Sequence, residues 1–235
     1  MADNAMRALV FWDIDLTLLD LRRIGASWLT IALTEATGEQ IVELPSFAGR
    51  TDRWITAEML RRVGRCATDA EIDQVQRAVI AIADKRKAEI AEVGIALPGA
   101  DAALRAIAAL PDVVQSLVTG NLAPIAGYKV AAFGLDAHLD LAIGGYGEVS
   151  QLRADLVGDA LARARSKYGE FAPDSVFVIG DTPHDIDAAL AHKARAIGVA
   201  TGRYSSEELH AAGAHAVLPD LTDTQAVLAL VRGQL

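Results

Sequence analysis

The chain has 235 residues, of which 52% are hydrophobic, and a formal net charge of −9. This length and balance predict one large globular domain, or one domain carrying a smaller insert, and argue against a disordered chain. The negative charge, with no dense cluster of Lys and Arg, argues against a nucleic-acid partner. A single cysteine excludes an intrachain disulfide, and no stretch approaches the ~20 apolar residues of a membrane span. We therefore expect a cytoplasmic protein with no membrane partner.

The first predicted strand, residues 8–12, is followed at once by two carboxylates. The apolar run Ala-Leu-Val-Phe-Trp is typical of a buried strand, and Asp13 and Asp15 come directly after it. A charge at the end of a buried strand is costly unless a partner or a ligand uses it. In an open α/β sheet, ligands bind at the carboxyl ends of the strands. This stretch therefore predicts a site with two acids and a cation between them.

Residues from about 20 to 95 show apolar side chains at helical spacing and no strand pattern. We expect helices over about 21–37, 51–63 and 70–93, with Thr51 capping the second and Thr68 or Asp69 capping the third. After residue 95 the chain alternates short apolar runs, at 113–118, 139–143, 175–179 and 194–200, with helical stretches. Such alternation predicts a mostly parallel sheet covered on both faces. We thus expect an α/β fold in which a Rossmann-like core, 1–19 and 96–235, carries an inserted all-helical cap at 20–95.

Three of the predicted strands end in polar side chains. Asp13 and Asp15 follow the first strand, Thr119 the second and Asp181 the fourth, with Asp185 four residues later in a helix. Because the carboxyl ends of parallel strands share one edge of a sheet, we expect these side chains to gather there. Four acids in one crevice require a cation, and carboxylates suit Mg²⁺. Two of these residues also have a purely structural interpretation: Thr119 can cap the next helix, and Asp185 can be a first-turn acid favoured by the helix dipole.

At these positions the chain resembles the haloacid dehalogenase (HAD) superfamily of Mg²⁺-dependent phosphotransferases, over nearly its whole length. The family's first motif, Asp-x-Asp-x-Thr, is matched by residues 13–17, although the usual glycine at position 16 is Leu16 here. Its second motif, a Thr or Ser ending the next core strand, is matched by Thr119. Its fourth motif, Gly-Asp-x-x-x-Asp, is matched by residues 180–185. One motif alone is a modest signal, whereas three in order at strand ends are a specific one.

The third motif of the family, a lysine or arginine, is the least clear in this chain. The family commonly has a lysine before a proline-rich turn, and no such lysine is present. Position favours Arg153, because it follows the predicted third strand at the start of a helix and its guanidinium suits phosphate oxygens. Lys129 is the rival, although inside a helix it would more often be a solvated surface residue. The choice between the two stays open at this point.

The resemblance implies a role for each matched residue. Asp13 would attack phosphorus to form an aspartyl-phosphate, and Asp15 would protonate the leaving oxygen and then activate water. Mg²⁺ would be held by the Asp13 carboxylate, the Asp15 main-chain carbonyl and Asp181. Asp185 would orient a water at the metal or support the cationic residue. The phosphoryl oxygens would be bound by the second-motif segment and their charge offset by the third-motif cation, which gives as residues Thr119, Gly120, Asn121 and Arg153.

By the same resemblance the insert is a cap of the C1 type, which would select the substrate. Arg50 and Thr51, in a glycine-containing turn of the insert, are the candidates for reaching the substrate, and a capping turn with a solvated arginine accounts for them equally well. The implied function is a phosphatase acting on a small phosphorylated metabolite, resembling phosphoglycolate phosphatases. A phosphomutase of the β-phosphoglucomutase type and a catalytically silent phosphate- or partner-binding protein are the alternatives. A monomer and a homodimer are both compatible with the sequence.

Overall fold

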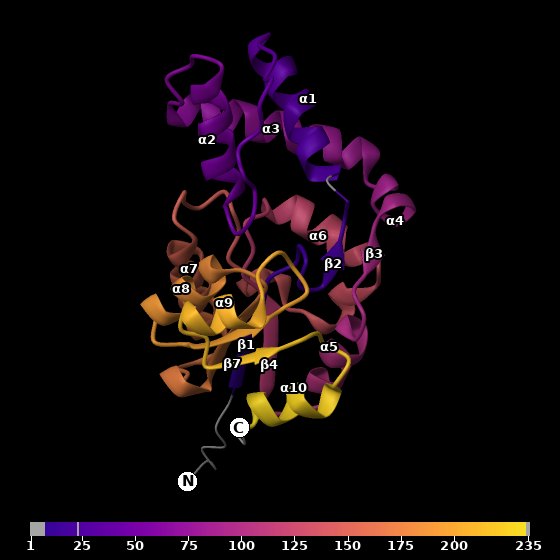
Figure 1. The fold of residues 1–235 in the computed structure, drawn as a ribbon, viewed down its shortest axis with the longest axis vertical. Coiled ribbons are helices and arrows are strands. Elements are labelled where there is room, and N and C mark those ends of the chain that lie inside the picture. The colour runs from indigo at the N-terminus through magenta and orange to yellow at the C-terminus, as the bar shows by residue number, and fades with distance from the viewer. Residues whose placement is uncertain (1–7, 23, 234–235) are drawn as a thin grey trace.

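The computed structural model describes residues 8–22 and 24–233, so that residues 1–7 of the predicted core lie outside the described residues (Figure 1). Its centre is a five-stranded parallel sheet with the strand order β4-β1-β5-β6-β7. The strands are β1 (Ala8–Trp12), β4 (Val113–Leu117), β5 (Val176–Gly180), β6 (Arg195–Val199) and β7 (Ala216–Leu218). The predicted α/β fold with a parallel sheet is confirmed.

Strand β1 is buried along its whole length and sets the position of the site. Val10 and Trp12 face one apolar cluster and Leu9 and Phe11 the other, as expected for a strand covered on both faces. Trp12 is paired in register with the last residue of β4 and with the fourth residue of β5. The three strands therefore end nearly level. The polar residues that follow them emerge at one edge of the sheet.

Helices cover both faces of the sheet. The cluster of Val10 and Trp12 contains side chains of α5 (Ala100–Ala108), α6 (Ala123–Ala131) and α10 (Thr224–Val231). The opposite cluster contains side chains of α7 (Arg153–Tyr168), α8 (Pro183–Ala191) and α9 (Ser206–Ala211). The sheet is thus a middle layer that supports a site only at its ends.

Four helices lie between the first strand of the sheet and the rest of the core: α1 (Ile24–Thr37), α2 (Asp52–Arg62), α3 (Asp69–Arg86) and α4 (Glu89–Val93). Figure 1 shows α1, α2 and α3 together above the sheet. Thr51 caps α2, as predicted, and of the two candidates for capping α3 it is Thr68 that does so, in a capping box with Glu71. Two short strands, β2 (Leu19–Asp20) and β3 (Ile95–Ala96), pair antiparallel where the chain enters and leaves these helices.

The structure corrects two predicted elements and contains a strand pairing that was not predicted. The strand expected at 139–143 is absent: the stretch contains the 3₁₀ helix η2 (Leu141–Ile143), preceded by η1 (Leu135–His138). Asp140 explains this, because its side chain accepts a hydrogen bond from the Ala142 N–H and closes a turn. The helix expected over 70–93 is divided into α3 and α4. The pairing of β2 with β3 was not predicted, because a strand of two residues is too short to show an alternation of apolar and polar side chains. Within the described ranges, none of the helices has the length and apolar character needed to span a membrane.

Candidate active site

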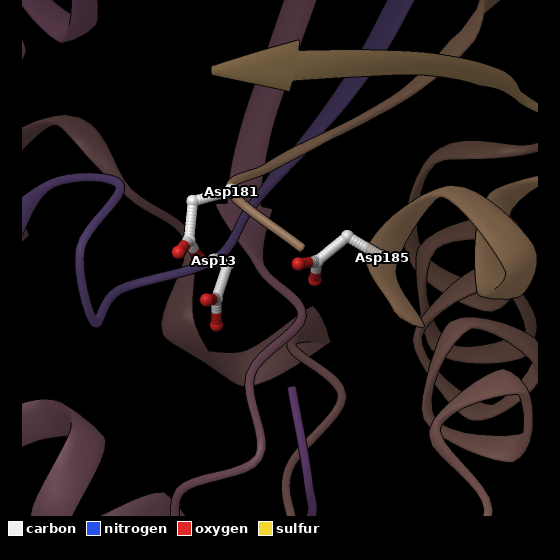
Figure 2. Close-up of side chains that lie close together, drawn as sticks. All are labelled: Asp13, Asp181 and Asp185. Atoms are coloured by element: carbon white, nitrogen blue, oxygen red, sulfur yellow. The ribbon is translucent and has the colours of Figure 1, made fainter. Parts of the chain in front are cut away.

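Three carboxylates meet at the carboxyl edge of the sheet. Asp13 follows β1, Asp181 follows β5, and Asp185 lies in the first turn of α8, and one oxygen from each lies within 4.8 Å of the others. Figure 2 shows the three side chains converging from these elements. All three are buried. Of the acids predicted to gather at this edge, Asp13, Asp181 and Asp185 thus lie together in the structure.

Arg153, the first residue of α7, joins two of these acids. Its Nη2 lies 2.7 Å from Asp13 Oδ1 and 2.6 Å from Asp185 Oδ1. Asp185 also has the structural role considered above, since its Oδ2 accepts hydrogen bonds from the main-chain N–H and the hydroxyl of Thr182, at 3.0 and 2.7 Å. One oxygen of Asp185 thus caps α8, and the other lies against Arg153.

The charge in this cluster fits a divalent cation. Burial raises the pKa of Asp13 to about 6, and burial together with the neighbouring carboxylates raises the pKa of Asp181 to about 9. Burial would lower the pKa of Arg153, but Asp13 and Asp185 outweigh it and raise that pKa above its ordinary value. When all three carboxylates are ionised, as metal ligands must be, the single guanidinium leaves two negative charges uncompensated among these four side chains. Oxygen donors with this excess charge suit a hard divalent cation.

Asp15 belongs to a separate polar cluster beside the first. Lys129 Nζ lies 2.7 Å from both Asp15 carboxylate oxygens and 2.6 Å from Asn121 Oδ1. Asn121 in turn donates from Nδ2 to Asp15 Oδ2 at 2.7 Å and to Thr119 Oγ1 at 2.8 Å. Burial would raise the pKa of Asp15, but the ion pair with Lys129 outweighs it and lowers that pKa. The cluster therefore favours an ionised and oriented Asp15.

The solvated position expected for Lys129 is wrong, because this residue is only 3% exposed. A signal for its burial was present in the sequence. Lys129 follows Ile125 by four residues and Ala126 by three, which places it on the apolar stripe of α6. Both candidate cations thus lie at the site: Arg153 forms an ion pair with Asp13, and Lys129 forms an ion pair with Asp15. Thr119 does not cap α6, whose N-cap is Leu122.

A cavity of about 780 Å³ opens between the sheet edge and the helices above it. Its floor includes Asp13, Asp15 and Asp181, and its walls include apolar side chains of the helical segment. Arg50 lines the cavity, with its guanidinium 4.4 Å from the centre of the Trp54 ring. The expectation for Thr51 is corrected: its side chain is fully buried and caps α2 by accepting from the Trp54 N–H at 3.1 Å.

Sequence reasoning missed two further parts of the site. Asp52 lines the cavity, is only 8% exposed and has a pKa raised to about 6 by burial, although its sequence position resembles an ordinary first-turn helix acid. The loop after β6 supplies Gly202 and Arg203. A Cβ on Gly202 would lie 1.8 Å from Asp181 Oδ2, so only glycine lets this loop approach the carboxylate. No motif in the sequence marks either feature.

Comparisons with known proteins find a family model that matches part of the chain and solved structures with a similar fold. Residues 153–224 match a family model described as HAD-hydrolase-like. The fold is similar to that of a hydrolase from Pseudomonas syringae, with a TM-score of 0.67 and 24% identity over 94% of this chain and 97% of that one. It is also similar to a protein assigned as a β-phosphoglucomutase from Bacteroides vulgatus, with a TM-score of 0.69 and 20% identity over 99% and 92% of the two chains. A search of curated proteins finds no match.

A third similar structure is a predicted phosphoglycolate phosphatase from Haemophilus somnus 129PT. Its TM-score is 0.62 and its sequence identity 16%, and the match covers 96% of this chain and 100% of that one. At these sequence identities the similarities establish the fold of this chain and do not assign it a substrate. The resemblance predicted from the motifs is confirmed. The chain has the fold of HAD-like hydrolases, and its C-terminal segment matches a HAD-like family model.

Proposed function

We propose that this chain is a Mg²⁺-dependent phosphatase that hydrolyses a small phosphorylated metabolite through an aspartyl-phosphate on Asp13. The observation that carries the proposal is the contact of Arg153 with Asp13 and Asp185, beside Asp181, at the edge of a parallel sheet. A nucleophile, a cation that offsets phosphoryl charge and a set of oxygen donors for a metal lie together there. The HAD-like fold and family match support this assignment.

In the first step the Asp13 carboxylate attacks phosphorus, and the bond from phosphorus to the leaving oxygen breaks. Asp15 enters this step in its protonated form and gives that proton to the leaving oxygen, which leaves the ionised carboxylate that Lys129 and Asn121 stabilise. In the second step Asp15, ionised and held by Lys129 and Asn121, takes a proton from water as the water oxygen attacks phosphorus and frees Asp13. Arg153 would offset negative charge on the phosphoryl oxygens, and the Thr119 hydroxyl and the main chain of residues 120–121, which line the same cavity, would bind them.

The three-carboxylate cluster and the Asp15 main-chain carbonyl would hold the metal, which when bound supplies positive charge toward the phosphoryl oxygens. The donor set favours Mg²⁺ because all its side-chain oxygens are carboxylate oxygens. We further propose that residues 20–95 act as a cap of the C1 type that selects the substrate. Arg50 is the residue of this segment that we expect to contact it, because its guanidinium lines the cavity.

The experiment that tests this function is phosphate release from p-nitrophenyl phosphate, with and without Mg²⁺, followed by a screen of phosphorylated metabolites that includes phosphoglycolate. Turnover that requires Mg²⁺ supports the proposal. No turnover of any phosphomonoester, together with no Mg²⁺ binding, would contradict it and would favour a silent binding protein.

A phosphomutase is the second candidate, because one similar structure is assigned as a β-phosphoglucomutase and residues of the helical segment line the cavity beside the sheet edge. A mutase must exclude water from the aspartyl-phosphate so that a sugar phosphate is rephosphorylated. Isomerisation of a hexose phosphate without release of inorganic phosphate would favour this second function.

A further inference from the structure

The start of helix α2 is bonded to the core by its main chain. We name residues 49–53 the docking turn. The N–H of Asp52 donates to the carbonyl of Gly120 at 2.6 Å, and the N–H of Arg53 donates to the carbonyl of Gly147 at 3.1 Å. The first N–H groups of a helix have no partner inside the helix. In α2 the Thr51 hydroxyl accepts a hydrogen bond from the Trp54 N–H. The N–H groups of Asp52 and Arg53, which precede Trp54, are satisfied by the two core carbonyls.

The docking turn fits the core without space for added atoms. A Cβ on Gly120 would lie 2.0 Å from the carbonyl oxygen of Arg50, and one on Gly147 would lie 1.7 Å from the carbonyl oxygen of Gly120. A Cβ on Gly49 would lie 2.6 Å from the ring of His184. At Gly120 and Gly147 the core thus packs main chain against main chain, whereas Gly49 of the docking turn packs against the His184 side chain; a side chain at any of the three positions would clash.

The Asp52 side chain adds a third hydrogen bond, to the loop of residues 119–122, which is the segment proposed above to bind the phosphoryl group. Its Oδ2 accepts from the Leu122 N–H at 3.0 Å, although burying a carboxylate is costly. Leu122 directly follows Asn121 and is the N-cap of α6, the helix that carries Lys129. Asn121 and Lys129 are the two side chains that hold Asp15. Asp52 therefore bonds the docking turn to the base of the segment that orients Asp15.

We propose that Asp52 is a positioning residue that makes the shape of the 119–122 loop depend on docking of the helical segment. This inference rests on the proposed phosphoryl transfer, because the loop's task is to bind the phosphoryl group and orient Asp15. Asp52 acts through Leu122 and touches neither phosphorus nor the leaving oxygen. When the helices are docked, the carboxylate fixes the loop; when they are undocked, the Leu122 N–H loses this acceptor.

Kinetics of two variants at position 52 test the coupling. Asp52→Ala removes the acceptor, and we expect kcat for p-nitrophenyl phosphate to fall roughly tenfold or more, the scale of one charged hydrogen bond, with a smaller change in KM. Asp52→Asn keeps a carbonyl oxygen that can accept from the Leu122 N–H, and we expect it to restore most of kcat. Asp69→Asn is the matched control, since this exposed acid pairs with the Arg53 side chain of the docking turn, whereas Asp52 bonds to Leu122 of the loop. A general loss of folding would lower the active fraction and would not be restored by Asn.

Amide hydrogen exchange supplies a readout that does not need catalysis. In the metal-free chain we expect Asp52→Ala to speed exchange at Leu122 at least tenfold, and Asp69→Asn to leave it unchanged. Unchanged exchange at Leu122, or faster exchange with an unchanged kcat, would overturn the proposal. If the wild-type chain releases no phosphate, the proposed function fails, and the exchange rates alone then decide whether Asp52 fixes the loop.

Discussion

The Arg153 guanidinium and the Asp13 carboxylate lie 2.7 Å apart, and each side chain is only 7% exposed. Two charges buried this closely hold each other in place, because separating them would leave each without compensation. The pair is formed by the first residue of α7 and the first residue after β1. Helix packing on the sheet thus fixes the cation beside the proposed nucleophile before any substrate arrives.

Removing the charge of Arg153 should lower kcat more than replacing the arginine with lysine. We expect Arg153→Ala to lower kcat about 100-fold or more, because Asp13 and the transferred phosphoryl group lose their offsetting charge. Arg153→Lys keeps the charge but loses the guanidinium whose Nη2 contacts both Asp13 and Asp185, and its kcat should lie between those of Arg153→Ala and wild type. Steady-state phosphate release measures both variants. A near-normal kcat for Arg153→Ala would show that this cation has no part in the reaction.

Lys129 should contribute to stability as well as to the site. Its ion pair with Asp15 is buried at the Lys129 end, where the side chain is 4% exposed, but 45% exposed at the Asp15 end. We therefore expect Lys129→Ala to lower the unfolding free energy by about 1–3 kcal/mol, between the values for exposed and buried pairs. Lys87→Ala, which breaks an exposed pair with Asp84, is the control and should cost about 0–1 kcal/mol. Urea denaturation decides; equal effects of the two variants would contradict the buried role.

Leu16 has φ 62°, in the left-handed region where the HAD-like motif ordinarily has glycine. A side chain there costs roughly 1–2 kcal/mol, so Leu16→Gly should be more stable than Leu16→Ala by about 1 kcal/mol. In a helix interior the order is reversed, and Leu228→Ala in α10 should be more stable than Leu228→Gly by about the same amount. Thermal unfolding of the four variants tests this. Ala more stable than Gly at both positions would contradict the strain at Leu16.

Metal binding should release protons. In the metal-free protein, burial and neighbouring carboxylates raise the pKa of Asp181 to about 9, so this group is mostly protonated at neutral pH. Its folded pKa exceeds the unfolded value, so the unfolding free energy of the metal-free protein should fall as pH rises between about 4 and 9. Mg²⁺ affinity should rise over the upper part of this range, because the ligand must lose its proton. Calorimetry at pH 7 in buffers of different ionisation enthalpy counts the protons; no release and a constant affinity would contradict the assignment of Asp181.

The parts of the fold that could be predicted are those with a strong local signal. The run of residues 8–12 is apolar throughout, and Thr51 and Thr68 have the side chains and spacing of helix caps, so β1, α2 and α3 were readable. The expected strand at 139–143 failed because one side chain, Asp140, closes a turn that apolar composition does not show. Pairing of β2 with β3 joins residues far apart in the chain and leaves no local pattern.

The residues of the site likewise fall into those that local sequence predicts and those that depend on tertiary packing. Asp13, Thr119, Asp181 and Asp185 follow or flank strand ends, so the parallel sheet alone predicts that they meet. The partner of each cation was not predictable, because it depends on which face of a helix is turned to the site. The role of Asp52 depends on where the helical segment rests on the core, a tertiary contact that one sequence does not reveal.

The measurement that tests the central claim most directly is the comparison of wild type with Asp13→Asn in Mg²⁺-dependent phosphate release. Mass spectrometry of the acid-quenched enzyme should accompany it. We predict that wild type releases phosphate and carries a transient phosphoryl group on the peptide containing Asp13, and that Asp13→Asn, folded by circular dichroism, shows neither. Phosphate release by Asp13→Asn at the wild-type rate would contradict the account.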